Sequence, residues 1–299
     1  MNTRREFIAN SAKFGALALM GVSGLTSFSF ASQKPQMQYL TLNNGVKMPI
    51  LGFGTSRIKD KETILKALQV GYRLIDTAQM YGNESEVGEA VKSSGIKRDE
   101  FFITTKLSSD MSYDETLKSF EVSMKKLKLD YLDLLLIHSP YSQAKQMYQA
   151  MEKLYNEKRI KALGVSNFKA DFFENFVKSC KVIPAINQCQ THIFHQQKPL
   201  RATMQKYKTI LESWSPFVAG KNNFFDNEIL KKIAQKHKKT IAQIALRFLI
   251  EQGIVVIPKT TNEARMKENL NVFDFSLDNE DRQTLNAMDT GKSQFGWDS

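Results

Sequence analysis

The sequence predicts an α/β fold, a closed (β/α)8 barrel of the TIM type with an N-terminal β-hairpin, and three observations predict it. Beyond residue 38, short apolar runs alternate eight times with amphipathic helical patterns, which favours a parallel sheet with right-handed crossovers. No glycine-rich dinucleotide fingerprint opens a strand-to-helix turn, which argues against an open Rossmann sheet. Residues 32–299 also suit one barrel domain, whose usual size is about 250 residues.

The predicted elements begin with the hairpin, because two apolar runs, Tyr39–Leu42 and Val46–Met48, flank the turn signal Asn43-Asn44-Gly45. Eight further runs predict the barrel strands: Ile50–Phe53, Tyr72–Ile75, Phe101–Thr105, Leu132–Ile137, Ile160–Val165, Ala185–Gln188, Thr209–Trp214 and Ile254–Ile257. Helical periodicity fills the gaps. Helices are expected over Thr116–Leu127, Ala170–Ser179 and, as a pair before the last strand, Asn227–Lys236 and Ile241–Glu251.

A twin-arginine signal peptide is predicted over residues 1–31, ahead of the barrel domain at 32–299. Arg4-Arg5 precedes an uncharged stretch from Phe14 to Phe30, and Ser29 and Ala31 fit the small-residue rule for cleavage after Ala31. We therefore expect the twin-arginine export machinery as a partner and the periplasm as the location. The alternative is an uncleaved anchor in the inner membrane, but the glycines of this stretch make it a weak membrane span.

Composition limits the remaining function classes. Hydrophobic residues make up 42% and charged residues 24% of the chain, which is ordinary for a globular protein. The formal net charge of +11 indicates either a solvated basic surface or attraction to anions such as phosphorylated cofactors. Because the lysines are scattered and no arginine-rich arm occurs, nucleic-acid binding is not expected.

The cysteines and histidines predict no metal site. Cys180 and Cys189 match no zinc or redox motif, so buried free thiols are expected, with a disulfide as the lesser alternative. His192 and His195 have a spacing that could suit a metal on a helix. However, they follow a strand-like run, and a loop at that point needs no metal.

Four polar residues mark the candidate active site. Asp76, Lys106 and His138 each end an apolar strand-like run, and Tyr81 lies five residues beyond Asp76. Taken singly, a strand-end aspartate commonly caps a helix and a strand-end lysine commonly reaches solvent. In a barrel of this type, however, active residues gather at the carboxyl ends of the strands. Four polar groups on successive strands therefore predict one site.

Six stretches together identify a family: Met48–Thr55, Gly71–Ala78, Tyr81–Glu84, Leu129–Leu134, Gly164–Phe168 and Ile257–Lys259. With these motifs the chain resembles the aldo-keto reductases, most closely the small bacterial members that resemble diketogluconate reductases. The similarity extends over roughly residues 38–292. The resemblance implies an NADPH-dependent enzyme that reduces small aldehydes and ketones to alcohols, with Asp76, Tyr81, Lys106 and His138 as its catalytic residues, here called the tetrad.

The chemistry of the tetrad suits that reaction. Carbonyl reduction needs a hydride at carbon, which the cofactor supplies, and a proton at oxygen. Tyrosine is a reluctant acid, with a pKa near 10, so we expect the Lys106 ammonium to lower the pKa of Tyr81 while Asp76 orients Lys106. Tyr81 would then act as the general acid. His138 would hydrogen-bond the carbonyl oxygen of the substrate.

The resemblance also implies cofactor contacts. Ser166, Asn167 and Gln188 would hold the nicotinamide carboxamide, and Trp214 would stack on its ring in place of the tyrosine of many relatives. Lys259, Thr260 and Arg265 would bind the 2′-phosphate, which predicts NADPH over NADH. Ser215, Pro216 and Phe217 would line the pyrophosphate, and Asn269 would contact the adenine. The other implied cofactor residues are Gly54 and Thr55.

The substrate pocket departs from the family pattern. Ser139 follows His138 where relatives often have tryptophan, and both residues are expected to contact the substrate. Trp297 in the tail is expected to close over the pocket and contact the substrate too, with a packed tail residue as the alternative. The substrate and the physiological direction of the reaction therefore cannot be transferred from relatives.

A monomer is expected. The alternative function is a nucleotide-binding regulatory barrel without physiological turnover, against which the intact tetrad argues.

Overall fold

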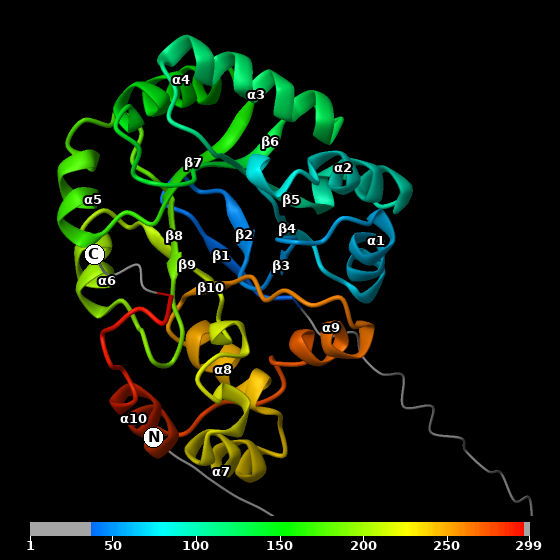
Figure 1. The fold of residues 1–299 in the computed structure, drawn as a ribbon, viewed down its shortest axis with the longest axis vertical. Helices are drawn as coiled ribbons and strands as arrows, with labels where there is room; N and C mark the ends of the chain where they lie inside the picture. Colours follow the sequence, from blue (N-terminus) through cyan, green and yellow to red (C-terminus); the bar gives the residue numbers. More distant parts are fainter. Residues whose placement is uncertain (1–36, 296–299) are drawn as a thin grey trace, which may run out of the picture. The chain divides into compact units, whose positions relative to one another are not determined.

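Eight parallel strands form the barrel that the sequence predicts (Figure 1). The structure is a computed structural model that describes residues 37–295. The strands follow one another in chain order around the sheet. Their bounds are β3 Phe53–Gly54, β4 Leu74–Asp76, β5 Phe102–Leu107, β6 Leu132–Ile137, β7 Ile160–Ser166, β8 Ile186–Gln190, β9 Ile210–Trp214 and β10 Val255–Val256.

The barrel closes where its first and last strands meet. Leu51 forms a parallel bridge with Val256, and the Gly52 amide donates to the Val256 carbonyl at 2.8 Å. Both strands at this seam are only two residues long, shorter than predicted, because the flanking apolar residues pair through isolated bonds. Gly54 is required here, since a Cβ atom on it would lie 2.8 Å from the carbonyl oxygen of Ile257.

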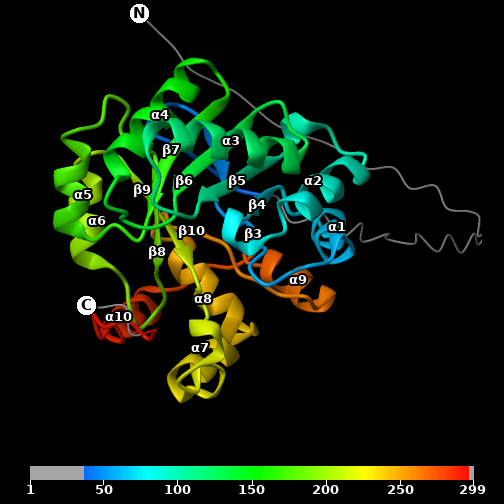
Figure 2. The same ribbon diagram turned by 45° about the horizontal axis from the view of Figure 1, so that its top comes forward.

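Helices surround the strands on the outside (Figures 1 and 2). The predicted pair before the last strand is confirmed. α3 begins three residues earlier than predicted, because Ser112 and Glu115 form a capping box at its start. The bounds are α1 Lys61–Val70, α2 Glu84–Ser93, α3 Tyr113–Leu127, α4 Ala144–Asn156, α5 Ala170–Val177, α6 Lys198–Gln205, α7 Glu228–His237, α8 Ile241–Ile250, α9 Glu263–Leu270 and α10 Asn279–Ala287. Short 3₁₀ turns are η1 Gln79–Tyr81, η2 Arg98–Glu100, η3 Val218–Gly220 and η4 Phe224–Asp226.

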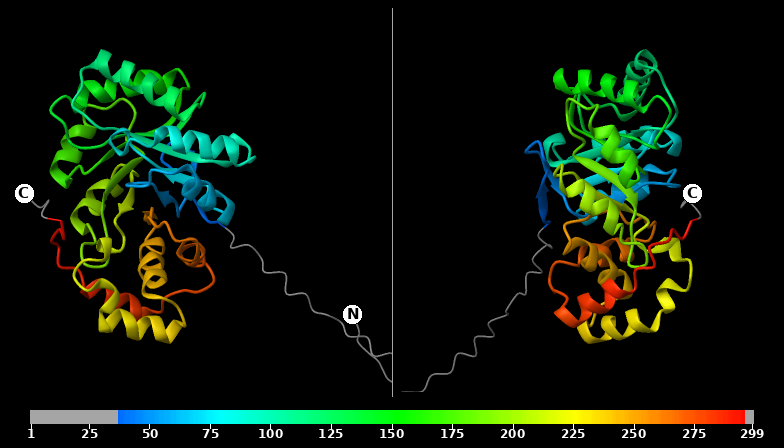
Figure 3. Two further views of the ribbon diagram at one scale, coloured as in Figure 1. Left: turned by 45° about the vertical axis from the view of Figure 1, so that its right-hand side comes forward. Right: turned by 90° about the vertical axis from the view of Figure 1, so that its left-hand side faces the viewer.

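The predicted hairpin covers the amino end of the barrel, as the right-hand view of Figure 3 shows. Its strands, β1 Tyr39–Thr41 and β2 Lys47–Pro49, pair antiparallel. Asn43 Nδ2 donates to the Pro184 carbonyl at 3.1 Å, and Asn44 Nδ2 donates to the Lys161 carbonyl at 2.9 Å. These bonds reach the starts of β8 and β7, so the hairpin plugs the end opposite the predicted site.

Two apolar cores flank the sheet. The larger core lies between the strands and the surrounding helices. The smaller core fills the inside of the barrel towards its amino end, with residues such as Leu74, Phe102 and Ile186. Side chains alternate between the two faces of a strand. Residues two or four positions later on the same strands, at the carboxyl end, therefore point into the barrel as well, and there they are polar.

The structure also bears on the expectations for the two cysteines and for a membrane span. Cys180 and Cys189 are both free thiols, but only Cys189 is fully buried and Cys180 is half-buried. None of the helices within residues 37–295 combines the length and apolar character needed to cross a bilayer. The predicted signal peptide at 1–31 lies outside the described residues.

Candidate active site

The structure brings the four residues of the tetrad together at the carboxyl end of the barrel. Asp76 is the last residue of β4, Lys106 lies one residue before the end of β5, and His138 follows β6 directly. Tyr81 closes the turn η1, which the chain forms after leaving β4. The four groups therefore converge from three adjacent strands, as predicted.

An ion pair forms the buried base of this site. Lys106 Nζ lies 2.6 Å from Asp76 Oδ1 and also donates to the Thr77 carbonyl at 2.9 Å. Both charged side chains are almost completely buried. Burial opposes the charge on Lys106, but the Asp76 carboxylate, together with Tyr81 and Glu212, outweighs this effect and raises the pKa of the lysine. Lys106 therefore stays an ammonium group at neutral pH.

Tyr81 lies directly over this pair. The centroid of its ring is 5.0 Å from Lys106 Nζ and 5.9 Å from the ring of His138. Burial raises the pKa of Tyr81 above its ordinary value, and the opposing effect of Lys106 is smaller. The expectation of a lowered pKa is thus wrong for the net shift, because desolvation outweighs the nearby charge. Tyr81 holds its proton at neutral pH.

His138 is neutral in this setting. Burial, followed by the charge of Lys106, lowers its pKa to about 3. Its Nδ1 atom lies 3.0 Å from the hydroxyl oxygen of Ser108, and its carbonyl accepts from Asn167 Nδ2 at 3.1 Å. A neutral imidazole carries one N–H group, which suits it to hydrogen-bond an oxygen without giving up a proton.

The predicted carboxamide residues form one hydrogen-bonded network beside the tetrad. Trp214 Nε1 donates to Asn167 Oδ1 at 2.9 Å, and Asn167 Nδ2 donates to Ser166 Oγ at 3.1 Å. Ser166 Oγ donates to the Gln188 carbonyl at 2.8 Å. Gln188 Nε2 donates to Asp76 Oδ2, also at 2.8 Å. The network thereby links the aromatic face of Trp214 to the base of the tetrad.

Glu212 is a site residue that the sequence analysis missed. It is fully buried on β9, in register with Gln188, and its Oε2 atom accepts from Gln188 Nε2 at 2.9 Å. Its other oxygen, Oε1, has no hydrogen-bond partner within residues 37–295. Burial, then the charge of Asp76, raises the pKa of Glu212 to about 8. A charged residue inside the strand-like run Thr209–Trp214 was the signal available in the sequence.

The predicted pyrophosphate residues lie in the chain that leaves β9. Ser215 has a left-handed φ of 56°, and the Val218 amide donates to its carbonyl at 2.9 Å. Pro216 is buried, while Phe217 is half-buried and packs near Phe225, with 5.9 Å between ring centroids. These residues follow Trp214 directly, so they lie beside the residues that are predicted to hold the nicotinamide.

The predicted 2′-phosphate residues form a separate group at the start of α9. Lys259 and Arg265 are exposed, and neither is ion-paired within the part of the chain that the structure describes. Thr260 Oγ1 accepts from the Asn262 amide at 3.1 Å, and Asn262 caps the helix. Unpaired cations at a helix amino end favour a bound anion.

The remaining predicted cofactor residues also have packing roles. Gly54 lies near Lys259 at the seam, since a Cβ atom added to Gly54 would lie 3.7 Å from the β-carbon of Lys259. Thr55 is buried and donates from Oγ1 to the Asp76 carbonyl at 2.9 Å, which fixes the end of β4. Asn269 is buried on α9 next to Tyr72, whose hydroxyl donates to the Met266 carbonyl at 3.1 Å. Their cofactor contacts stay predictions.

Ser139 and the C-terminal tail lie on the substrate side of the site. Ser139 is half-buried beside His138, whereas Trp297 lies outside the described residues. The tail before it reaches the site, because the Phe295 ring lies 5.5 Å from the ring of Trp214. A pocket of about 450 Å³ opens between Trp214, Asn167 and the tail residues Lys292 and Ser293.

No cluster of three or more metal-ligating side chains occurs in residues 37–295. His192 and His195 form a tight turn after β8, in which each backbone amide donates to the other residue's carbonyl. Burial, followed by His195, lowers the pKa of His192 to about 3. The loop placement expected for this pair is confirmed.

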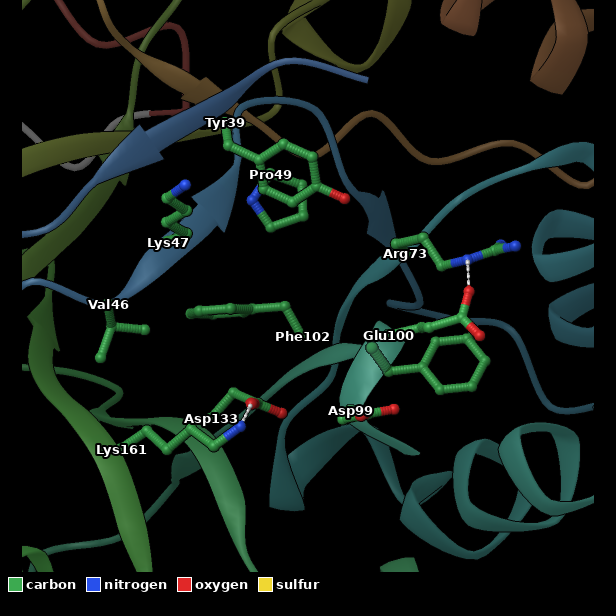
Figure 4. A pocket seen from close by; sticks show the side chains of 11 residues that line it. Tyr39, Val46, Lys47, Pro49, Arg73, Asp99, Glu100, Phe102, Asp133 and Lys161 are labelled. Carbon is green, nitrogen blue, oxygen red and sulfur yellow. Dashed lines mark ion pairs between the residues drawn. The ribbon is translucent and has the colours of Figure 1, made fainter. Parts of the chain in front are cut away.

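A second pocket, of about 340 Å³, lies at the amino end of the barrel beneath the hairpin (Figure 4). Its charged side chains face one another: Lys161 Nζ is 3.0 Å from Asp133 Oδ1, and Arg73 Nε is 4.0 Å from Glu100 Oε2. In each of these ion pairs the two charges neutralise each other. The pocket also lies at the amino ends of the strands, away from the tetrad. The candidate site is therefore the carboxyl end.

Comparisons with known proteins show the family to which the chain belongs. A model of the Aldo/keto reductase family matches residues 50–290. The glyoxal reductase of Bacillus subtilis (strain 168) is 42% identical over 253 residues, covering 83% of this chain and 91% of that protein. The crystal structure of an aldo/keto reductase from Brucella melitensis has a TM-score of 0.81 and 42% identity, covering 85% of this chain and 100% of that one. A Bombyx mori aldo-keto reductase complexed with NADPH has a TM-score of 0.82 and 31% identity, covering 87% and 90%.

Proposed function

Because the chain belongs to the aldo/keto reductase family, we propose that Asp76, Tyr81, Lys106 and His138 carry out its reaction on small aldehydes and ketones. The chain is an NADPH-dependent oxidoreductase that reduces carbonyl groups to alcohols. The alternative of a regulatory barrel without turnover has no support among the relatives. The buried Lys106–Asp76 pair beneath Tyr81, beside a neutral His138, is the observation that carries the proposed roles.

The residues present fit the cofactor. Amide and hydroxyl groups of Ser166, Asn167 and Gln188 offer the donors and acceptors that a carboxamide needs, and Trp214 offers an aromatic face. Lys259 and Arg265 offer exposed cations for a phosphate at the start of α9. NADPH, when bound, supplies a hydride to the carbonyl carbon.

The protein's own groups then manage the proton. His138 donates a hydrogen bond to the carbonyl oxygen and holds it beside Tyr81. Tyr81 gives its phenolic proton to that oxygen as negative charge develops there. Lys106 stabilises the phenolate left behind, and Asp76 keeps Lys106 in place through the 2.6 Å contact. The high resting pKa of Tyr81 ensures that the proton is present when the substrate binds.

Turnover by the purified chain tests this proposal. NADPH oxidation is followed with glyoxal, the substrate named for the Bacillus subtilis relative, and with other aldehydes, ketones and sugar ketones. We expect NADPH-dependent reduction of several small carbonyl compounds. A chain that binds NADPH and reduces none of them would contradict the proposed roles of the tetrad.

We also propose that the protein is exported through the twin-arginine machinery to the periplasm as a folded monomer, with NADPH already bound. Arg4-Arg5 and the small residues Ser29 and Ala31 support the signal, and this machinery carries folded proteins. A bound cofactor stabilises the fold in proportion to the ratio of its concentration to its dissociation constant.

Fractionation of cells tests the export proposal. The wild-type chain should appear in the periplasm, shortened by residues 1–31, while the variant with Arg4→Lys and Arg5→Lys should stay in the cytoplasm. A full-length membrane-bound product would instead indicate an uncleaved anchor. The recovered protein is then measured for bound nucleotide and for mass by sedimentation, where a dimer would overturn the monomer proposal.

A further inference from the structure

Ser108 connects the three elements that carry the tetrad. It lies two residues beyond Lys106, half-buried just past the end of β5. Its hydroxyl oxygen lies 3.0 Å from His138 Nδ1 and 3.2 Å from the Lys106 carbonyl, and it accepts from the Met80 amide at 3.2 Å. One small side chain thus contacts the end of β5, the turn that carries Tyr81, and the ring of His138.

A second residue holds Ser108 in this position. Gln79 Oε1 accepts from the Ser108 amide at 3.1 Å. The amide nitrogen of Gln79 is fixed in turn by Ser119 and Ser123 on α3, with Nε2 to Oγ distances of 2.8 and 2.9 Å. The Ser108 hydroxyl therefore has little freedom to move away from His138.

The contact to Nδ1 matters because a neutral imidazole has two tautomers. Only the form protonated at Nε2 can donate a hydrogen bond from that atom to a carbonyl oxygen, and in this form Nδ1 is an acceptor. The partner of one ring nitrogen decides which nitrogen carries the proton. Since burial keeps His138 neutral, its tautomer determines whether it can hold a substrate carbonyl.

We propose that Ser108 is a positioning residue that donates its hydroxyl proton to His138 Nδ1 and thereby fixes the Nε2-protonated tautomer. The proposal rests on the substrate-binding role given to His138 above. The hydroxyl has one proton and two acceptors in reach, and Nδ1, at 3.0 Å, is nearer than the Lys106 carbonyl at 3.2 Å. The Met80 amide already donates to the Ser108 hydroxyl oxygen and occupies one of its lone pairs. This disfavours a second bond in which Nδ1 would donate to the same oxygen.

Three substitutions separate this role from mere packing. Ser108→Thr keeps the hydroxyl and should keep the tautomer. Ser108→Ala removes the donor, so a mixture of tautomers is expected, with kcat/KM lowered about three- to tenfold. Ser108→Asp offers only acceptors, so it should place the proton on Nδ1 and lower kcat/KM by about a hundredfold or more. The matched control is Ser119→Ala, which removes a hydroxyl from the same network without touching the His138 ring.

The decisive measurement is the tautomer itself. Full-length chain labelled with ¹⁵N in the histidine rings is saturated with NADP⁺, and the His138 signals are assigned by their loss in His138→Gln. We expect Nε2 protonated in the wild type and in the threonine and Ser119→Ala variants, a mixture in the alanine variant, and Nδ1 protonated in the aspartate variant. Thermal unfolding of each variant confirms that it is folded.

The outcomes distinguish this inference from the proposed function. A wild-type ring protonated at Nδ1, or identical tautomers in the wild type and the Ser108→Asp variant, overturns the role of Ser108. Full activity in His138→Gln instead contradicts the role of His138 in the proposed function, whatever the tautomer shows. A loss of activity in Ser108→Asp with an unchanged tautomer assigns Ser108 to packing alone.

Discussion

The tetrad and the proposed 2′-phosphate residues are built in opposite ways, although we propose that both serve one reaction. Lys106 and Asp76 are buried, and their charged atoms contact fixed partners before any ligand arrives. Lys259 and Arg265 are exposed, with no ion pair in the described chain. The contrast indicates that the barrel itself organises the proposed reacting groups, whereas the proposed phosphate contacts would form only when the ligand binds.

This difference has an energetic reason. A buried charge without a partner is strongly destabilising, so the groups around Lys106 must satisfy one another in the folded protein. An exposed cation costs little when it has no partner, because water solvates it. Its interaction energy therefore remains available for binding. Substitutions in the tetrad should accordingly affect both catalysis and folding, whereas substitutions of Lys259 or Arg265 should affect only the affinity for the cofactor.

The largest effect is expected for Tyr81→Phe. Removing the phenolic proton should lower kcat/KM about 10²- to 10⁴-fold, the range typical of general acid catalysis. The dissociation constant of NADPH should stay within about twofold of wild type, because the ring and its packing are kept. Single-turnover NADPH oxidation and fluorescence titration measure the two quantities. Activity near that of wild type would remove Tyr81 from the mechanism.

Lys106→Met should break both activity and stability. The substitution leaves the Asp76 carboxylate buried without its cation, which costs about 3–5 kcal/mol of unfolding free energy. The double variant Lys106→Met with Asp76→Asn removes the uncompensated charge, so it should recover stability but not turnover. Urea unfolding and kinetic assays report the two effects. Recovery of activity in the double variant would show that Lys106 has no electrostatic role toward Tyr81.

Arg265→Ala tests the other region. A charge-assisted hydrogen bond to phosphate contributes about 1.5–3 kcal/mol, so the NADPH dissociation constant should rise roughly 10- to 100-fold. Affinity for NADH and thermal stability should change little. Lys267→Ala is the matched control, because it removes a cation from the same helix that is already paired with Glu263. Equal losses in the two variants would mean that net charge alone governs affinity.

A pH-dependent effect on stability is expected from Glu212. Its pKa rises from an ordinary value of 4.5 to about 8 on folding, so between these values the folded state binds more protons than the unfolded state. The unfolding free energy should therefore fall with pH across this window, by at most about 1.4 kcal/mol per pH unit. Glu212→Gln removes this dependence. Its stability relative to wild type should rise from pH 5 to pH 8, and a constant difference in urea unfolding would contradict the shift.

Much of the site could be predicted because strand ends are visible in the sequence. Asp76, Lys106 and His138 each close an apolar run, and barrel geometry then brings them together. Ser108 and Glu212 were missed for a different reason, since their partners depend on strand register and on the path of a turn. The direction of the Tyr81 pKa was missed because the sequence displays the neighbouring charge but not the depth of burial.

The seam between β3 and β10 has a consequence for synthesis. Leu51 and Val256 must meet to close the barrel, although they lie about 200 residues apart in the chain. A nascent chain on the ribosome cannot make this contact until nearly all of the protein has been translated. Until then β3 presents an unpaired edge, the kind of surface at which chains aggregate. Loss of the residues after Ile254 would leave that edge open permanently, and a prematurely terminated chain should be recognised by chaperones and proteases rather than accumulate as a smaller barrel.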